Sequence, residues 1–367
     1  MRLISINSAR PGMKVGRAIW NEVGHPLLQK DVTITDAIIR RLKQMNIQYI
    51  YIEDEISKGI EIQETIPFEK RKKAVTQIAN TFQQVKGLDA RKAAFVLDKQ
   101  SKIIGNVVED LLDSILNSKD MLTVLTDTFL YDEALFHHSF NVALYSIAIA
   151  KELGYGVEDL RTIGTGALLH DVGKMVVPVK ILQKPCQLTD EEYEIMKQHT
   201  RYGFDILRNL HTVSLLVAHC AFQHHERLDG SGYPRGLVDY EIHPYAKIIA
   251  VADVFDAVTS ERVYREKLLP FQGIALIQSG SGTLYEKRIV EAFKRSVVHY
   301  QNGTVVYLSD GRRGIVVKQN ENNSALPWVR IFEENGTLIS STYLINLEDS
   351  PRVFIRKVET EYFEYVE

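Results

Sequence analysis

The sequence predicts a mainly α-helical protein with a small mixed α/β module at its N-terminus and a β-rich module at its C-terminus. Three observations lead to this prediction. Apolar side chains recur at helical spacing over much of residues 66–300. Residues 301–367 instead alternate apolar stretches with turn-forming residues, and residues 1–65 carry both patterns. A chain of 367 residues is long enough for two or three domains.

Residues 1–65 are expected to form the mixed module. The stretches Ala18–Trp20 and Ile47–Ile52 are rich in β-branched and aromatic residues, which is typical of strands. Between them, Thr35 suits the N-cap of a short helix. Residues 66–120 predict connecting helices, with a stalk or a dimerisation element as alternatives. Amphipathic spacing does not choose between a core and an interface, so a homodimer stays open.

Residues 121–300 are expected to form a helical domain. Apolar positions over residues 135–153 recur at helical spacing. Thr189–Glu192 matches a capping box, so a helix begins there. A further helix is predicted over residues 213–225, and Pro244 suits the first turn of another.

Residues 301–367 are expected to form β-hairpins that build a small barrel or sheet. Three apolar stretches with strand-like composition alternate with turn signals. The stretches are Thr304–Leu308, Arg313–Val317 and Trp328–Phe332, and the turn signals are Ser309–Gly311, Asn320–Asn323 and Asn335–Gly336.

Composition argues against several classes of protein. The formal net charge of −3 gives no sign of a nucleic-acid binder, so any anion site must be local. The two cysteines, Cys186 and Cys220, form no Cys-x-x-Cys motif, which favours a reducing compartment. The N-terminus lacks the pattern of a signal peptide, and no apolar stretch is long enough to span a membrane. We therefore expect a cytoplasmic protein that binds neither a nucleic-acid polymer nor a membrane.

Nine of the eleven histidines lie between residues 137 and 243, within the expected helical domain. An isolated helical histidine is more often structural, but histidines beside carboxylates are common metal ligands. His170 and Asp171 follow the apolar run Ile163–Leu169, where a buried carboxylate is costly unless it is paired or bound to a metal. An ordinary polar helix end is the alternative.

Two further places in the helical domain carry candidate ligands. Asp253 sits inside an apolar stretch, which a metal explains better than an Arg partner or a helix cap. Asp256, one turn later, is interpreted as a surface acid rather than as a partner of a ligand. His224 and His225 would point about 100° apart on a helix, so they can approach one ion only if the helix ends there.

These blocks resemble the HD-GYP domain, a branch of the HD phosphohydrolase superfamily. The resemblance covers roughly residues 121–300, about half of the chain, and the blocks occur in the family's order. The matching residues are His138-Ser139, His170–Lys174, His199, His224–Glu226, Asp229–Pro234, Asp253–Asp256 and Arg262–Arg265.

The resemblance implies an all-helical core with two divalent metal ions, for which mixed His and Asp ligands favour iron or manganese. Family members hydrolyse the bacterial second messenger cyclic di-GMP to linear pGpG, and some continue to GMP. A hydroxide that bridges the two ions is the expected nucleophile. Asp171 would bridge the ions; His138, His170 and Asp253 would complete the first site, and His199, His224 and His225 the second.

The resemblance also implies the substrate-binding residues. The loop of Gly232, Tyr233 and Pro234 would border the cleft. Lys174 would stabilise charge on the phosphate and act in catalysis with Asp171. Three more residues match positions near the substrate, although a solvated basic surface is the alternative for the two arginines: Asp132, Arg262 and Arg265.

One departure from the family bears on the product. Some members bind a third metal through a Glu four residues before the first ligand histidine, where this chain has Ala134. Glu133 is one position off, a rotation of about 100° on a helix. We therefore expect two ions, and cleavage of pGpG to GMP is in doubt.

Three functions remain open from the sequence. We favour an active cyclic di-GMP phosphodiesterase. The alternatives are a weakly active cyclic dinucleotide receptor and an HD hydrolase of another phosphoester. The terminal modules are assigned to regulation or assembly.

Overall fold

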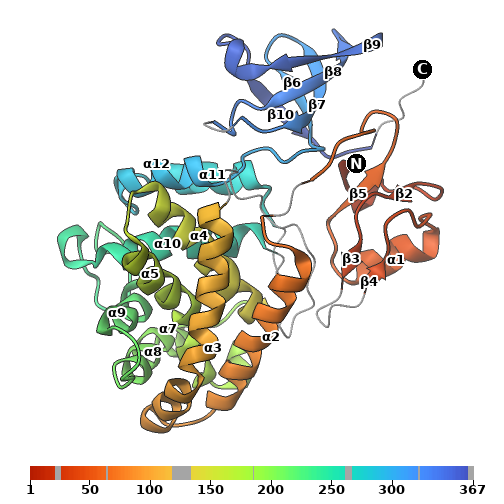
Figure 1. Cartoon of the computed structure of the whole chain (residues 1–367). Helices are drawn as coiled ribbons and strands as arrows, with labels where there is room; N and C mark the ends of the chain where they lie inside the picture. The colour runs from red at the N-terminus through yellow and green to blue at the C-terminus, as the bar shows by residue number, and fades with distance from the viewer. Residues whose placement is uncertain are drawn as a thin grey trace.

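The computed structural model describes the chain except for residues 21–25, 63–64, 118–133, 185, 261–266, 321–322 and 363–367. A large helical body carries two small β modules at one side, formed by the two ends of the chain (Figure 1). The prediction of a mainly helical protein with a small N-terminal sheet module and a C-terminal sheet is confirmed. In the described part of the chain, no helix combines the length and apolar character that crossing a membrane requires.

The N-terminal module is a small antiparallel sheet, in the order β1-β5-β2, with helix α1 beside it. The expected N-cap is present, because the Thr35 hydroxyl accepts a hydrogen bond from the Ile38 amide at 3.3 Å. The elements are β1 (Arg2–Ser5), η1 (Ile6–Ser8), β2 (Lys14–Val15), β3 (Ile19–Trp20), β4 (Pro26–Leu28), α1 (Asp36–Gln44) and β5 (Tyr49–Glu53).

The helical body has one continuous apolar core, whose buried residues run from Ile66 to Val297. Its helices are α2 (Phe68–Val85), α3 (Ala90–Asn117), α4 (Ala134–Glu152), α5 (Val157–Leu169), α6 (Val179–Leu182), α7 (Asp190–Lys197), α8 (His199–Leu207), α9 (Leu215–Gln223), α10 (Pro244–Thr259), α11 (Pro270–Ser279) and α12 (Lys287–Ser296). Short 3-10 turns lie between them: η3 (Val172–Met175) and η4 (Asp239–Glu241).

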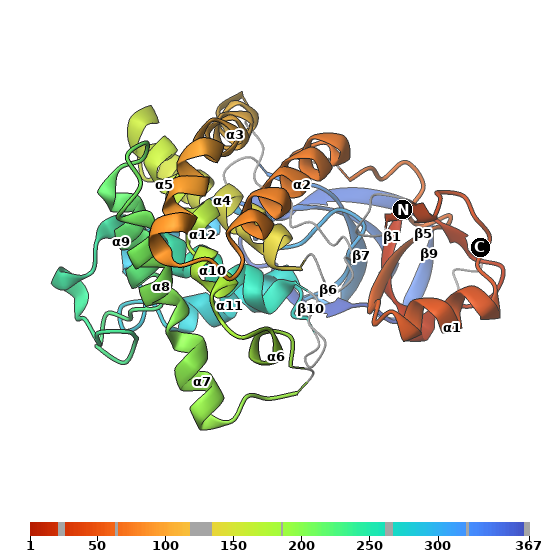
Figure 2. The same cartoon turned by 90° about the horizontal axis from the view of Figure 1, so that it is seen from below.

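Helices α2 and α3 pack into this core and do not project as a stalk (Figures 1 and 2). Their apolar stripes include Phe82 and Leu97, both almost fully buried. On α4, Phe136 meets Phe82 edge to face, with ring centroids 5.9 Å apart. The amphipathic pattern of residues 66–120 is therefore satisfied within the chain, mainly by α4 and α5.

The C-terminal module is an antiparallel sheet of five strands in the order β10-β6-β7-β8-β9, so the expected hairpins are present. Asn335 and Gly336 connect β8 to β9 with φ values of 50° and 80°, the two positive angles that a tight hairpin turn requires. The elements are β6 (Val305–Leu308), β7 (Arg312–Lys318), β8 (Trp328–Glu334), β9 (Thr337–Asn346), η5 (Leu347–Asp349) and β10 (Ile355–Glu359).

The two β modules contact each other directly. The Leu3 amide donates to the Gly303 carbonyl at 3.0 Å, and the Ser5 amide donates to the Thr360 carbonyl at 2.6 Å. A shared apolar cluster also joins the modules; its buried members are Ile56, Ile60, Val305, Ile315 and Phe332. The modules therefore form one unit, which meets the helical body where the Lys267 amide donates to the Gln48 side chain at 3.1 Å.

His299 lies at the junction between the helical body and the C-terminal module. The Ser324 hydroxyl donates to the Val297 carbonyl at 2.9 Å and lies 2.7 Å from His299 Nδ1, so Nδ1 carries the proton of that bond. Burial, helped by the charge of Lys294, lowers the pKa of His299 to about 4.

We predict that this histidine makes the protein less stable in acid. The unfolded chain binds a proton at His299 near pH 6.5, while the folded chain resists it until about pH 4. The stabilisation is therefore present above about pH 6.5 and is lost as the pH falls, by about 2 kcal/mol at about pH 5. Urea unfolding at about pH 6.5 and at about pH 5 measures the free energy of unfolding at each pH. This free energy should depend less on pH in His299→Asn, whose side chain keeps a hydrogen-bond donor but cannot titrate. Equal pH dependence in the two proteins would contradict the prediction.

Candidate active site

The centre of the site is a turn at the end of α5. His170 follows the last residue of α5, and Asp171 precedes η3. Gly173 in this turn faces the start of α8, where an added Cβ would lie 1.9 Å from the His199 carbonyl oxygen and 2.5 Å from the Gly203 nitrogen. Only a glycine therefore lets α8 approach closely enough to bring His199 to Asp171.

The first cluster gathers three of the predicted ligands around the turn. The Nε2 atom of His138, from α4, lies 3.7 Å from Oδ2 of Asp171. His170 Nε2 lies 3.4 Å from the same oxygen. One ligand atom from each of these residues lies within 4.8 Å of the others. Asp253 of α10 completes the group, with its Oδ1 at 3.1 Å from His138 Nε2.

The second cluster contains His199, His224 and His225, whose ligand atoms also lie within 4.8 Å of one another. Helix α9 ends at Gln223, so the histidine pair lies where the helix stops, as the sequence required. His199 Nε2 is 3.3 Å and His224 Nε2 is 3.9 Å from Asp171 Oδ1. Asp171 thus directs Oδ2 toward the first cluster and Oδ1 toward the second.

Backbone carbonyls orient three of these imidazoles. The Nδ1 atom of His170 lies 2.6 Å from the Ala167 carbonyl, and that of His199 lies 2.6 Å from the Met196 carbonyl. His224 Nδ1 is likewise 2.9 Å from the carbonyl of Ala221. A carbonyl only accepts, so each Nδ1 carries the proton and each Nε2 presents a lone pair to its cluster.

Two buried atoms of the clusters lack hydrogen-bond partners among the described residues. They are His170 Nε2 and Asp171 Oδ1, on residues that are at most 1% exposed. Buried polar atoms are normally paired, and these two are acceptors that face other acceptors. A divalent cation would satisfy them together, so the donor set fits a metal centre.

The protonation states suit metal binding. Burial opposes ionisation of Asp171, but the Lys174 ammonium group and the neighbouring His170 hold the pKa of this carboxyl well below its usual range. Burial lowers the pKa of His224 and His225 well below the ordinary value, so both are neutral. Metal ions bind carboxylates and neutral imidazoles, and these groups need no deprotonation at neutral pH.

His138 differs from the other histidines because it is held by two carboxylates. Burial would lower its pKa, but the hydrogen bonds to Asp253 and Asp256 raise it to about 9. Its Nδ1 lies 2.7 Å from Asp256 Oδ2, and Asn141 and Ser260 donate to the other oxygen of that carboxylate. The interpretation of Asp256 as a surface acid is wrong, since it is 2% exposed and orients His138.

The Gly-Tyr-Pro loop lies against the second cluster. The Tyr233 ring is 4.6 Å from the His225 ring, and the Tyr233 amide donates to the His225 carbonyl at 3.2 Å. An added Cβ on Gly232 would lie 2.5 Å from that carbonyl oxygen, so the close approach requires glycine. Pro234 follows at the end of the turn. The loop is fixed by Glu226, whose carboxylate accepts backbone hydrogen bonds at 2.9 Å from Arg235 and Leu237.

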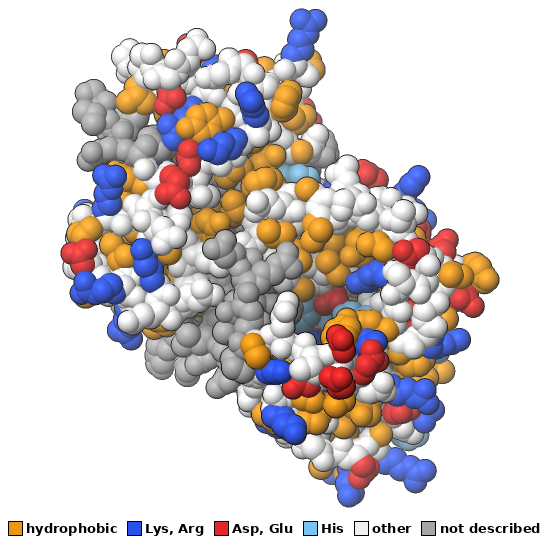
Figure 3. All heavy atoms as spheres, turned by 180° about the vertical axis from the view of Figure 1, so that it is seen from behind, with side chains coloured by type: hydrophobic (Ala, Val, Ile, Leu, Met, Phe, Trp, Pro, Cys, Tyr) orange, Lys and Arg blue, Asp and Glu red, His pale blue; other side chains and the backbone are white. Residues whose placement is uncertain are grey.

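Sequence reasoning did not assign a role to Glu226. Its only signal was an acid placed directly after two ligand histidines and before a glycine-rich loop. Among the other predicted site residues, Lys174 forms an ion pair with the Asp171 carboxylate. Asp132, Arg262 and Arg265 lie outside the described residues, so their roles stay predictions. On the face seen in Figure 3, histidine and acidic side chains show at the bottom of a recess.

We predict that Gly173→Ala destabilises the protein by at least about 2 kcal/mol, because the methyl group would displace the backbone of α8. Gly105→Ala in α3 is the matched control. Its Cβ would meet nothing within 4 Å, so it should stabilise by about 0.5–1 kcal/mol. Chemical unfolding of the two variants measures the difference, and a Gly173→Ala protein as stable as the parent would refute the close approach.

We also predict that Asp256→Asn weakens binding of manganese about 10- to 100-fold, because His138 loses the charge that raises the basicity of its ring. Titration calorimetry on metal-free protein measures the affinity. Asp239→Asn is the control, since Asp239 lies in η4, is exposed and pairs with Lys247 of α10. Identical affinities in both variants would show that Asp256 does not support the ligand.

Comparisons with known proteins show the family of this chain. Residues 111–289 match a family model described as an HD domain. The chain is 30% identical to a cyclic di-GMP phosphodiesterase of Pseudomonas aeruginosa, over 90% of this chain and 85% of the relative. It is 42% identical to a cyclic di-GMP phosphodiesterase of Thermotoga maritima, over 55% of this chain and 54% of the relative. A 3'3'-cGAMP-specific phosphodiesterase of Vibrio cholerae is 37% identical, over 44% of this chain and 35% of the relative. With the two clusters and the Gly-Tyr-Pro loop in place, the chain belongs to the HD-GYP branch of the HD domain family.

Proposed function

We propose that this protein is a metal-dependent phosphodiesterase that hydrolyses cyclic di-GMP to linear pGpG. The observation that carries the proposal is the buried carboxylate of Asp171, which presents one oxygen to each of two histidine clusters. The Pseudomonas aeruginosa and Thermotoga maritima relatives, both named as cyclic di-GMP phosphodiesterases, support the choice of substrate.

Two ions, iron or manganese, would be held by the clusters, with Asp171 between them. The first would take His138, His170 and Asp253, and the second would take His199, His224 and His225. When bound, such a pair supplies an activated water near neutral pH and neutralises charge on the phosphate. Apart from His138, whose pKa is raised to about 9 and which would release a proton when an ion binds, the carboxylates and neutral imidazoles of this site are the donor set that such ions prefer.

The chain's own residues would position the substrate. Lys174 lies beside Asp171 with its side chain 20% exposed, so its ammonium group can also reach a phosphate oxygen at the edge of the centre. Such a fixed cation stabilises negative charge that develops on the phosphate. Tyr233 would border the cleft, because its ring packs against His225 and Glu226 fixes its loop.

The product is proposed to be the linear dinucleotide. Ala134 stands at the position where some members of the family have a third metal ligand, and its methyl group cannot bind an ion. With two ions, one cyclic phosphodiester would be opened and pGpG released. The same centre would serve a receptor that binds cyclic di-GMP and barely turns over, so turnover is the property to measure.

The experiment is anaerobic hydrolysis of cyclic di-GMP by protein loaded with iron or manganese, with the metal content counted. We expect turnover near two ions per chain, pGpG as the end product and loss of turnover on chelation. Asp171→Asn should lose at least about 100-fold in rate, because it removes the charge shared by both clusters. Asp205→Asn, which changes an acid that pairs with Arg208, is the control. If protein that holds two ions binds cyclic di-GMP tightly but does not hydrolyse it, the protein is a receptor and the proposed enzyme function is wrong.

A further inference from the structure

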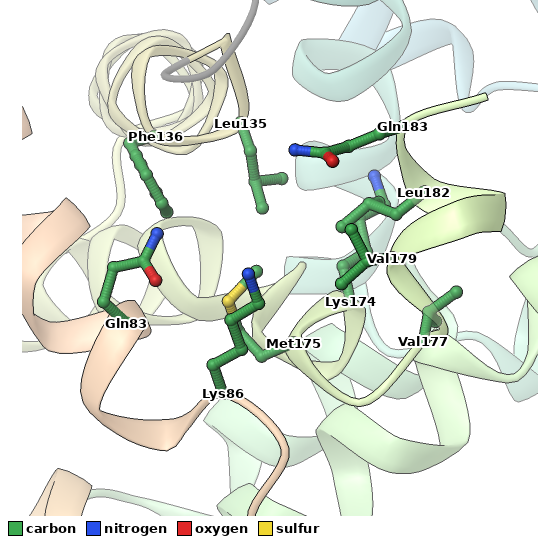
Figure 4. Close-up of a pocket in the computed structure, with 10 residues that line it drawn as sticks. All are labelled: Gln83, Lys86, Leu135, Phe136, Lys174, Met175, Val177, Val179, Leu182 and Gln183. Atoms are coloured by element: carbon green, nitrogen blue, oxygen red, sulfur yellow. The ribbon is translucent and has the colours of Figure 1, made fainter. Parts of the chain in front are cut away.

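A second hollow of about 170 Å³ opens beside the metal centre, where three parts of the helical body meet (Figure 4). Its walls come from the end of α2, the start of α4 and the segment from η3 to α6. The side chains that matter here are Gln83, Lys86, Phe136, Lys174, Met175 and Gln183.

Lys174 connects this hollow to the metal centre. Its side chain lines the hollow, while its ammonium group pairs with the Asp171 carboxylate. The end of α2 is fixed against the same turn, because the Gly87 amide donates to the Met175 carbonyl at 3.2 Å. A substrate whose phosphate reaches Lys174 would therefore have its neighbouring groups over the hollow.

The lining selects a particular chemistry. Phe136 and Met175 provide buried apolar surface, and the Gln83 and Gln183 amides turn toward the hollow from opposite sides (Figure 4). A primary amide both donates and accepts, which matches the edge of a purine base. Among the residues that the structure describes, no carboxylate lines the hollow. In size, a cavity of about 150 Å³ holds a benzene ring, so a base can enter in part.

Lys86 adds a cation that the fold does not use. It is exposed at the end of α2 and forms no ion pair with the residues that the structure describes. Together with Lys174, it places two positive charges on the rim of a partly apolar hollow. This combination fits a base that carries a phosphate nearby, because the base would contact the apolar and amide side chains and the phosphate would contact the two lysines.

We propose that this hollow binds a guanine base of cyclic di-GMP and that Lys86 contacts the phosphate that is not cleaved. The inference rests on the proposed function and deepens it. Gln83 and Lys86 lie outside residues 111–289, which match the HD domain. Helix α2, which follows the N-terminal module in the chain, therefore completes the substrate site and helps to set its specificity.

The test compares the double variant Gln83→Ala/Lys86→Ala with Gln84→Ala/Lys73→Ala, which removes the same groups from exposed positions of α2 outside the hollow. Three substrates are used: cyclic di-GMP, 3'3'-cGAMP and bis(p-nitrophenyl) phosphate, a small diester without bases. We expect the first variant to raise KM for cyclic di-GMP at least about tenfold and change kcat less than about threefold. Its preference between the two cyclic dinucleotides should change, while hydrolysis of the small diester and metal content stay as in the parent.

The outcomes separate the two proposals. If the parent cleaves cyclic di-GMP and both double variants match it in KM and in preference, the subsite is overturned while the proposed function stands. The subsite is also overturned if both double variants raise KM for cyclic di-GMP equally. The effect would then come from any such change in α2 and not from the hollow. If the parent hydrolyses the small diester but neither binds nor cleaves cyclic di-GMP, the proposed function fails and the subsite fails with it.

Discussion

One buried carboxylate, Asp171, determines how the helical body is arranged. A lone charge in this position would be costly, since the residue is 1% exposed. Lys174 and His170 offset part of that cost on one side, and His199 approaches the other oxygen. Because the neighbours come from separate helices, α4, α5, α8, α9 and α10 must all converge on the turn that carries Asp171.

The convergence is supported by groups that contact the ligands from outside. Main-chain carbonyls hold Nδ1 of three histidines, and Asp256 does the same for His138. Glycines at positions 173 and 232 let backbones approach where any side chain would clash. The clusters are therefore preorganised by the fold itself, which lowers the cost of ordering them when an ion binds.

The sequence predicted most of the centre because its chemistry leaves local marks. Three features are visible in the sequence itself: a carboxylate after an apolar run, a histidine pair before a glycine-rich loop, and the order of the blocks. Asp256 could not be placed, because its burial depends on α4 crossing α10, and a helical acid looks the same on either face. The packing of α2 was equally hidden, since an apolar stripe does not name what covers it.

The hydrogen bonds between the first and last parts of the chain have a consequence for its synthesis. Ser5 pairs with Thr360, and Leu3 pairs with Gly303, so strand β1 binds residues that are synthesised long after it. Contacts of such wide sequence separation form slowly, because a long loop must close first. The helical body ends with α12, so it can begin to assemble while the C-terminal module is still being made. The β unit then closes only after Thr360 has been made, because this residue pairs with Ser5.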